Sequence, residues 1–159
     1  MILKRSIKSG FGFGLTSGII TTLGLIIGLY SGVHSRKVII GGILTIAVAD
    51  ALSDALGIHI AEESKKHPTI EIWEATLSTL FSKFLFAISF LLPMLIFSLK
   101  LAIVVSIVWG LLLLTVFSIY VANERGVNPW KVVMEHISIA VLVIILTYYV
   151  GIFICHNFS

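Results

Sequence analysis

Two aspartates one helical turn apart are the residues best suited to chemistry in this sequence. Asp50 and Asp54 follow an apolar run that begins near Val38, and Ser53 lies between them. On a helix, residues four apart share a face with their side chains about 6 Å apart, so both carboxylates can bind one divalent cation. Oxygen ligands suit hard or borderline ions such as Mn²⁺ and Fe²⁺. Two neighbouring carboxylates can also exchange protons, which suits ion-coupled transport. Asp50, Asp54 and Ser53 are therefore the candidate metal site.

Lys83 is the candidate charge partner of these aspartates. It lies about eight residues, or about 12 Å, into its own apolar segment. Asp50 and Asp54 lie at similar depths in theirs. An ion pair between Lys83 and either aspartate would allow the charges to survive in lipid. Such a pair is a purely structural alternative to a transport site, although the remaining carboxylate would still be free to act.

A second group of metal-binding side chains lies on both sides of Pro68, in residues 59–74. Carboxylates together with imidazoles can collect divalent transition metals. The candidates for such a collecting site are His59, Glu62, Glu63, Glu71 and Glu74. The alternative is an ordinary solvated connection in which Lys65 and Lys66 balance the acidic charge.

The composition excludes a soluble domain. Hydrophobic residues make up 58% of the 159 residues, and charged residues only 12%. The surface of a soluble domain must meet water, so it cannot hide this much apolar area. The net charge of +3 requires no nucleic-acid partner, because lysines and arginines beside membrane spans account for it. The sequence therefore predicts an integral membrane protein.

Five segments are long enough to cross a bilayer, which takes roughly 20 apolar residues. The sequence predicts a single all-α domain, residues 1–159, whose spans are residues 10–30, 38–61, 75–97, 101–122 and 132–155. With the N-terminus inside, seven lysines and arginines fall in the inner segments and three in the outer ones. This excess predicts an N-inside, C-outside orientation.

Glycines recur at every fourth position in two parts of the first span. They are Gly10, Gly14 and Gly18, followed by Gly24, Gly28 and Gly32. Helices in lipid associate through close van der Waals packing, and small residues allow their backbones to approach. The spacing therefore predicts a close helix contact. It lies either within the chain or between the first helices of two copies.

Four stretches of the chain, in order, resemble the vacuolar iron transporter family, which includes plant nodulin-like members and the yeast vacuolar iron and manganese importer. The stretches are FGLTSGIITTLGLIIGL, GGILTIAVADALSD, FSKFLFAISFLLPMLIF and NERGVNPWKVVMEHISIAVLVIILTYYVG. The resemblance implies a homodimer whose first helices line an ion path, so that the glycines form the dimer contact. It implies export of Fe²⁺, often with Mn²⁺, from the cytoplasm in exchange for protons. It also places Asp50 and Ser53 where the family has a second-helix glutamate and serine.

The chain departs from the family pattern at several positions. Ser17 stands where the family has a first-helix aspartate, and Ile46 where it has a second-helix methionine. Larger members carry a metal-binding domain between the second and third spans, where this chain has only residues 62–74. Lys83 is also unexpected for the family.

These features together predict a divalent metal transporter that moves Fe²⁺ or Mn²⁺ out of the cytoplasm by proton antiport, without a permanently bound cofactor. The expected partners are the lipid bilayer and a second copy of the chain. A non-transporting metal sensor or scaffold is the alternative. An enzyme such as an intramembrane aspartyl protease is not expected, because Asp50 and Asp54 stack on one helix. The host would be the cell membrane of a prokaryote or a vacuole-like organelle of a eukaryote.

Overall fold

The computed structural model describes residues 4–158, and the described residues form six helices. The helices are α1 (Arg5–Val33), α2 (Arg36–Ser64), α3 (Thr69–Ser89), α4 (Leu91–Ile96), α5 (Leu99–Arg125) and α6 (Pro129–Phe158). With α3 and α4 taken together, five helical segments are long and apolar enough to cross a membrane. The prediction of an all-helical integral membrane protein with five spans is thereby confirmed.

The helices extend beyond the predicted spans. A helix of 29 residues, such as α2, is about 43 Å long, whereas the hydrocarbon core is about 30 Å thick. The polar ends therefore remain helical: α2 continues to Ser64, and α3 begins at Thr69, before the apolar part of its segment. Apolar composition marks the membrane-crossing part of a helix, but the backbone hydrogen bonds decide where the helix ends.

Short connections join the helices. His34 adopts a left-handed conformation, with φ of 53°, at the end of α1, so α2 starts after only one more residue. Gly126 does the same at the end of α5, with φ of 63°, a conformation that glycine adopts without steric strain. The Asn128 side chain then accepts a hydrogen bond from the backbone N–H of Trp130 at 3.0 Å, which caps the start of α6.

The third span is broken at Phe90, between α3 and α4. Pro93 follows three residues later and has no N–H to donate to the carbonyl four residues before it. At the far end of α4, the Arg36 guanidinium donates a hydrogen bond of 2.6 Å to the Phe97 carbonyl. This bond ties the start of α2 to the end of the broken helix.

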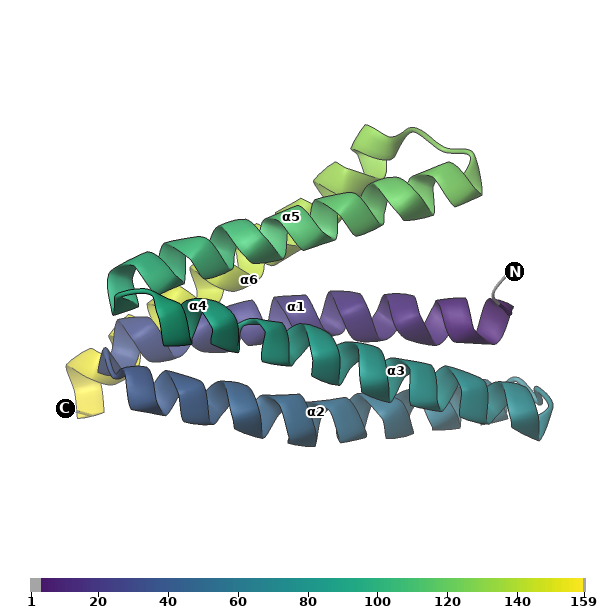
Figure 1. Ribbon diagram of the computed structural model, residues 1–159, viewed down its shortest axis with the longest axis horizontal. Coiled ribbons are helices and arrows are strands. Elements are labelled where there is room, and N and C mark those ends of the chain that lie inside the picture. The colour runs from purple at the N-terminus through teal and green to yellow at the C-terminus, as the bar shows by residue number, and fades with distance from the viewer. Residues whose placement is uncertain (1–3, 159) are drawn as a thin grey trace.

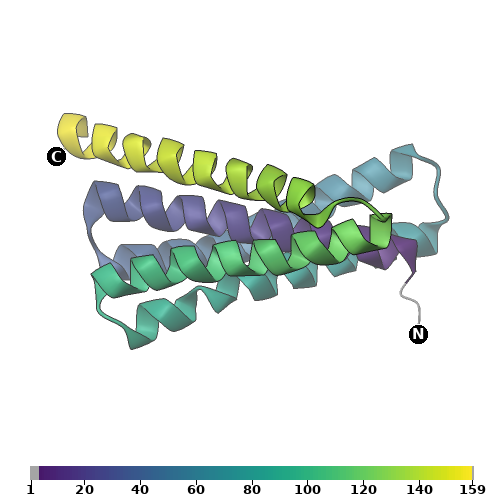
Figure 2. The ribbon, with the colours of Figure 1, turned by 90° about the horizontal axis from the view of Figure 1, so that it is seen from above.

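Helix α1 is the centre of the bundle and packs against α2, α3, α5 and α6. Figure 1 shows α2 and α3 on one side of α1 and α5 on the other, with α6 running behind α5 and α1. The N- and C-termini lie at opposite ends of the bundle in both Figure 1 and Figure 2, as five crossings require. The N-terminal end also holds the α2–α3 and α5–α6 connections.

The apolar core surrounds α1. Its largest fully buried apolar side chains are Ile19, Leu23 and Ile26 of α1, Ile39 and Ile43 of α2, and Phe90, Met94 and Leu114. Many large apolar side chains on the other helices are exposed, which suits contact with lipid. The core thus holds the bundle together from its central helix outward.

The glycines of α1 make their close contacts within the chain. Gly10, Gly14 and Gly18 face α3, whereas Gly24, Gly28 and Gly32 face α6. A Cβ atom at Gly14 would lie 2.5 Å from the Thr79 carbonyl oxygen, closer than real Cβ contacts allow. These positions are therefore occupied by neighbouring helices of the same chain, and a dimer contact through α1 would have to use its other residues.

Candidate functional site

Lys83 of α3 lies at the centre of a cluster of polar side chains between α1, α2 and α3. Its ammonium is 2.5 Å from Asp54 Oδ2 and 2.6 Å from Asp50 Oδ2. It also donates a hydrogen bond of 2.9 Å to Ser17 Oγ, and Ser17 in turn donates to Asp54 Oδ2 at 2.6 Å. Lys83 therefore contacts both aspartates at once. The sequence predicted an ion pair with one of them and did not indicate which one.

The two aspartates are not equivalent partners of the lysine. Asp54 Oδ2 accepts hydrogen bonds from both Lys83 and Ser17. Asp50 Oδ2 lies close to the ammonium, but the angles do not make a hydrogen bond, and this buried atom accepts none from the described residues. Asp54 is thus the partner that hydrogen bonds hold in place. Asp50 is held mainly by charge.

Glycine in α1 makes room for the lysine. A Cβ atom at Gly18 would lie 3.0 Å from the Lys83 carbonyl oxygen and 3.3 Å from Lys83 Cγ. Because Gly18 has no side chain, α1 approaches α3 closely and the lysine stem runs past it. The neighbouring Ser17 is thereby brought within reach of the ammonium.

The cluster carries a net charge of −1 when all three groups are ionised. Only 1% of the Lys83 side chain is exposed, whereas 29% of Asp50 and 21% of Asp54 are. A charge inside a span is costly unless it is paired or hydrated. The lysine is therefore buried behind the carboxylates, and the carboxylates form the accessible side of the site.

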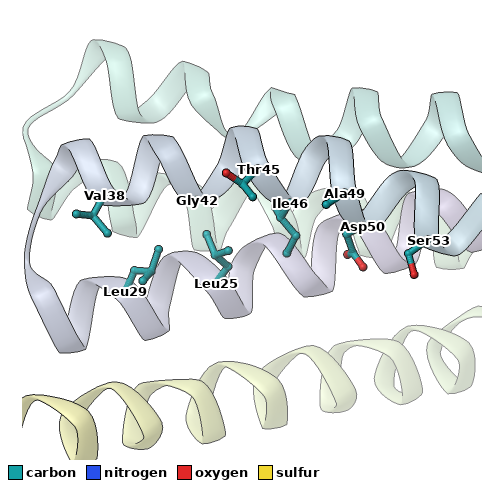
Figure 3. Close-up of a pocket in the computed structure, with 9 residues that line it drawn as sticks. All are labelled: Leu25, Leu29, Val38, Gly42, Thr45, Ile46, Ala49, Asp50 and Ser53. Carbon is teal, nitrogen blue, oxygen red and sulfur yellow. The ribbon is translucent and has the colours of Figure 1, made fainter. Parts of the chain in front are cut away.

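Asp50 opens onto a shallow apolar groove between α1 and α2, which we call the α1–α2 groove. Its lining residues are Leu25 and Leu29 of α1, with Val38, Gly42, Thr45, Ile46, Ala49, Asp50 and Ser53 of α2. Figure 3 shows Asp50 and Ser53 together at one end of it, with Val38 at the other. The groove therefore runs from the α1–α2 connection to the carboxylate site, and Ile46 lines it one turn before Asp50.

Ser53 does not join the lysine cluster. It is exposed on α2 and makes no side-chain hydrogen bond to any residue from 4 to 158. Its place beside Asp50 at the end of the groove still leaves its hydroxyl available to a ligand that approaches along the groove. Of the three residues predicted to bind metal, two contact Lys83 and the third lies beside them.

His59 binds a neighbouring helix and not a shared metal cluster. Its Nδ1 is 3.0 Å from Thr76 Oγ1, and Thr76 donates its single hydroxyl hydrogen to the Ile72 carbonyl at 2.7 Å. His59 Nδ1 must therefore be the donor to Thr76. The ring also packs edge-on against Trp73, with 4.9 Å between ring centroids.

The predicted collecting site is not assembled in the described residues. Glu62 is buried and accepts hydrogen bonds from Lys65 at 2.8 Å and His67 at 2.6 Å. Among residues 4–158, no three histidine, cysteine, aspartate or glutamate side chains come close enough to hold a metal ion. Glu63 is exposed, and Glu71 lines the same polar pocket as Glu62, Lys65 and His67. Of the two lysines that the alternative named, Lys65 balances the charge of Glu62, whereas the Lys66 side chain pairs with no acidic residue among residues 4–158; His67 is the second partner of Glu62.

Glu74 is bound to the N-terminal end of the chain. It accepts hydrogen bonds from Lys4 at 2.6 Å and from Ser6 at 2.7 Å. The hydrogen bond and the charge of Glu74 raise the pKa of the Lys4 ammonium above its usual range. This pair, in which Lys4 is exposed and Glu74 is partly buried, links the start of α1 to α3.

Ser17 belongs to the site, although it is not among the metal ligands predicted from the sequence. A serine inside an apolar helix usually bonds to its own backbone, so residue type alone gives no signal. The available signal was its position in the first-helix stretch, where the resembling family has an aspartate. In this chain the hydroxyl bridges Lys83 and Asp54 without adding negative charge.

Comparison with known proteins yields no match to a family model, to a curated protein or to a solved structure.

Proposed function

We propose that this protein transports divalent metal ions, Fe²⁺ or Mn²⁺, out of the cytoplasm in exchange for protons. Asp50 and Asp54 would form the intramembrane cation site, with Lys83 as their charge partner. The observation that carries the proposal is a pair of part-exposed carboxylates on Lys83, of which Asp50 lines the end of the α1–α2 groove and Asp54 lies one turn further along α2. Ionisable side chains inside membrane spans usually mark ion pathways or proton relays.

A row of polar residues along the sequence of α2 is our candidate for a proton path on the other side of the site. His59 lies between Asp54 and Glu62 along the helix, and the row ends near the α2–α3 connection. Eight residues separate Asp54 from Glu62, which corresponds to about 12 Å along the axis. In the N-inside orientation that we propose, this row leads to the cytoplasm and the α1–α2 groove leads outward.

Replacing Asp50 with asparagine should reduce metal flux about tenfold or more, because the amide removes the negative charge that attracts the cation. The measurement is entry of Mn²⁺ or Fe²⁺ into liposomes that contain a metal-sensitive dye, under an imposed pH gradient. Glu63→Gln is the matched control, because it removes an exposed carboxylate from the same helix away from the site. Wild-type rates in both Asp50→Asn and Asp54→Asn would contradict the proposal.

A non-transporting sensor or scaffold is the second candidate. Lys83 already neutralises one of the two carboxylates, and Ser17 supplies no charge at the position where the resembling family has an aspartate. A site arranged in this way can support a stable fold without moving an ion. Mn²⁺ binding by the folded wild-type protein without flux in liposomes would identify this function.

We also propose that two copies associate over the α1–α2 groove. The exposed face of α2 presents small side chains at every fourth position: Gly41, Thr45, Ala49, Ser53 and Gly57. Cβ atoms at Gly41 and Gly57 would have no other atom within 4 Å, so this face is free within one chain. Small residues allow close helix contact in lipid, and a second copy would shield Asp50 from the acyl chains.

Replacing Ala49 with tryptophan should convert the dimer to a monomer, because the large ring prevents close approach at the centre of this face. The measurement is the protein mass in mild detergent, by light scattering after size-exclusion chromatography. Val108→Trp places the same ring on the exposed surface of α5 and should leave the dimer intact. A monomeric wild-type protein, or a dimer that survives Ala49→Trp, would exclude this contact.

A further inference from the structure

We infer that Lys83 is a tethered competitor for divalent cations at Asp50 and Asp54, and that it keeps the affinity of the site for these ions low. This inference rests on the proposed function, because it takes the two carboxylates as the cation site. It assigns Lys83 a role in regulating that site that differs from the structural pairing expected from the sequence.

The geometry gives the ammonium the position that a shared cation would take. Its Nζ is 2.5 Å from Asp54 Oδ2 and 2.6 Å from Asp50 Oδ2, so it already joins the two carboxylates. A divalent cation that binds both carboxylates must either share them with the ammonium or displace it. In either case the like charges repel one another over a short distance, in surroundings that screen charge less than bulk water does.

The lysine is fixed in this position from several sides. Its side chain is 1% exposed, its stem passes Gly18, and its ammonium also donates to Ser17. The charged groups that face it are Asp50 and Asp54, both from α2, while α1 contributes only the Ser17 hydroxyl. Because the competitor is attached to α3, it cannot diffuse away, and dilution does not weaken it.

The charge of the site makes the inference specific for divalent ions. Two carboxylates and one ammonium leave a net charge of −1, which a single monovalent cation neutralises. While the ammonium remains, the charge of +2 on a divalent ion exceeds the net charge of −1 on the site. Removing the ammonium leaves −2, which matches a divalent ion. Loss of Lys83 should therefore increase Mn²⁺ binding more than Na⁺ binding.

The test compares Lys83→Met with the wild-type protein and with Lys83→Arg. Methionine has a similar length and no charge, whereas arginine retains the positive charge. Binding of Mn²⁺ to the full chain in detergent micelles is measured from the electron paramagnetic resonance signal of free Mn²⁺, and Na⁺ binding from its competition with Mn²⁺. Lys83→Met should bind Mn²⁺ about tenfold more tightly or better, while Lys83→Arg stays within about twofold of wild type.

Mn²⁺ binding by folded Lys83→Met that is no tighter than in the wild type would overturn the inference. An equal gain for Na⁺ and Mn²⁺ would overturn it too, because it would indicate a general loosening of the site. If Lys83→Met does not fold, Asp54→Asn is compared with the double variant Lys83→Met/Asp54→Asn. The double variant keeps the wild-type charge of −1, and it must bind Mn²⁺ more tightly than Asp54→Asn does.

Flux through the wild-type protein separates this inference from the proposed function. Wild-type flux together with unchanged Mn²⁺ affinity in Lys83→Met would reject the competitor and retain the transporter. Tighter binding in Lys83→Met without any wild-type flux would retain the competitor and reject the transporter.

Discussion

Replacing Gly14 with leucine is expected to prevent the chain from folding into a stable bundle. A side chain at this position would meet the Thr79 carbonyl oxygen, 2.5 Å from the new Cβ, and the Lys83 backbone nitrogen at 3.0 Å. Backbone atoms cannot rotate away as a flexible side chain can, so α1 and α3 would have to separate. Overpacking of this kind should destabilise the protein by about 3 kcal/mol or more.

The separation of α1 and α3 should also disturb the charge site. Gly14 lies one helical turn before Gly18, which makes room for the Lys83 stem. The measurement is the amount of monodisperse protein that survives heating, by size-exclusion chromatography in detergent. Ser138→Leu is the control, because it adds a leucine at an exposed position of α6, away from the proposed dimer face. Similar heat resistance in the two leucine variants would contradict the role of Gly14.

Replacing Lys83 with glutamate is expected to be the most damaging single change within the charge site. The variant would bring a third carboxylate toward Asp50 and Asp54 and remove the cation that both of them contact. Breaking a buried ion pair by removing one partner typically destabilises a protein by about 3–5 kcal/mol. Repulsion between the carboxylates adds to this loss. Little folded protein should therefore be recovered from membranes.

Two further variants separate the effect of charge from the effect of shape. Asp54→Asn leaves Asp50 to balance Lys83, so most of the heat resistance should remain. Combining Lys83→Glu with Asp54→Lys restores one positive and two negative groups, and it should recover part of the stability lost in Lys83→Glu. If the double variant is no more heat-resistant than Lys83→Glu, packing and not charge determines the stability of this site.

Much of the fold could be predicted because apolar composition and length are local properties of the chain. Each of the five segments carries enough apolar residues to cross a bilayer, and the structure has five such helices. The break at Phe90 was not predicted, although Pro93 was visible. Proline removes one helical hydrogen bond, but the surrounding packing decides whether a span bends, breaks or stays straight.

The candidate charge site could be predicted only in part. The depth of a residue in the membrane follows from counting residues along its helix. The sequence could therefore show that Lys83 lies at a depth similar to that of Asp50 and Asp54. Its contact with both aspartates depends on how α2 and α3 are rotated about their axes, which counting does not give. Ser17 joins the site for the same reason, since it comes from a third helix.

The sequence by itself determined that α1 approaches other helices closely, because glycine at every fourth position leaves a strip without side chains in each half of the helix. Only the tertiary structure decided which helix packs against each strip. Gly14 contacts α3 near the charge site, whereas Gly28 contacts α6 near Thr147. The physical reason is that a glycine stripe permits close approach without specifying a partner. The partner is chosen by the packing of the other four spans around the central helix.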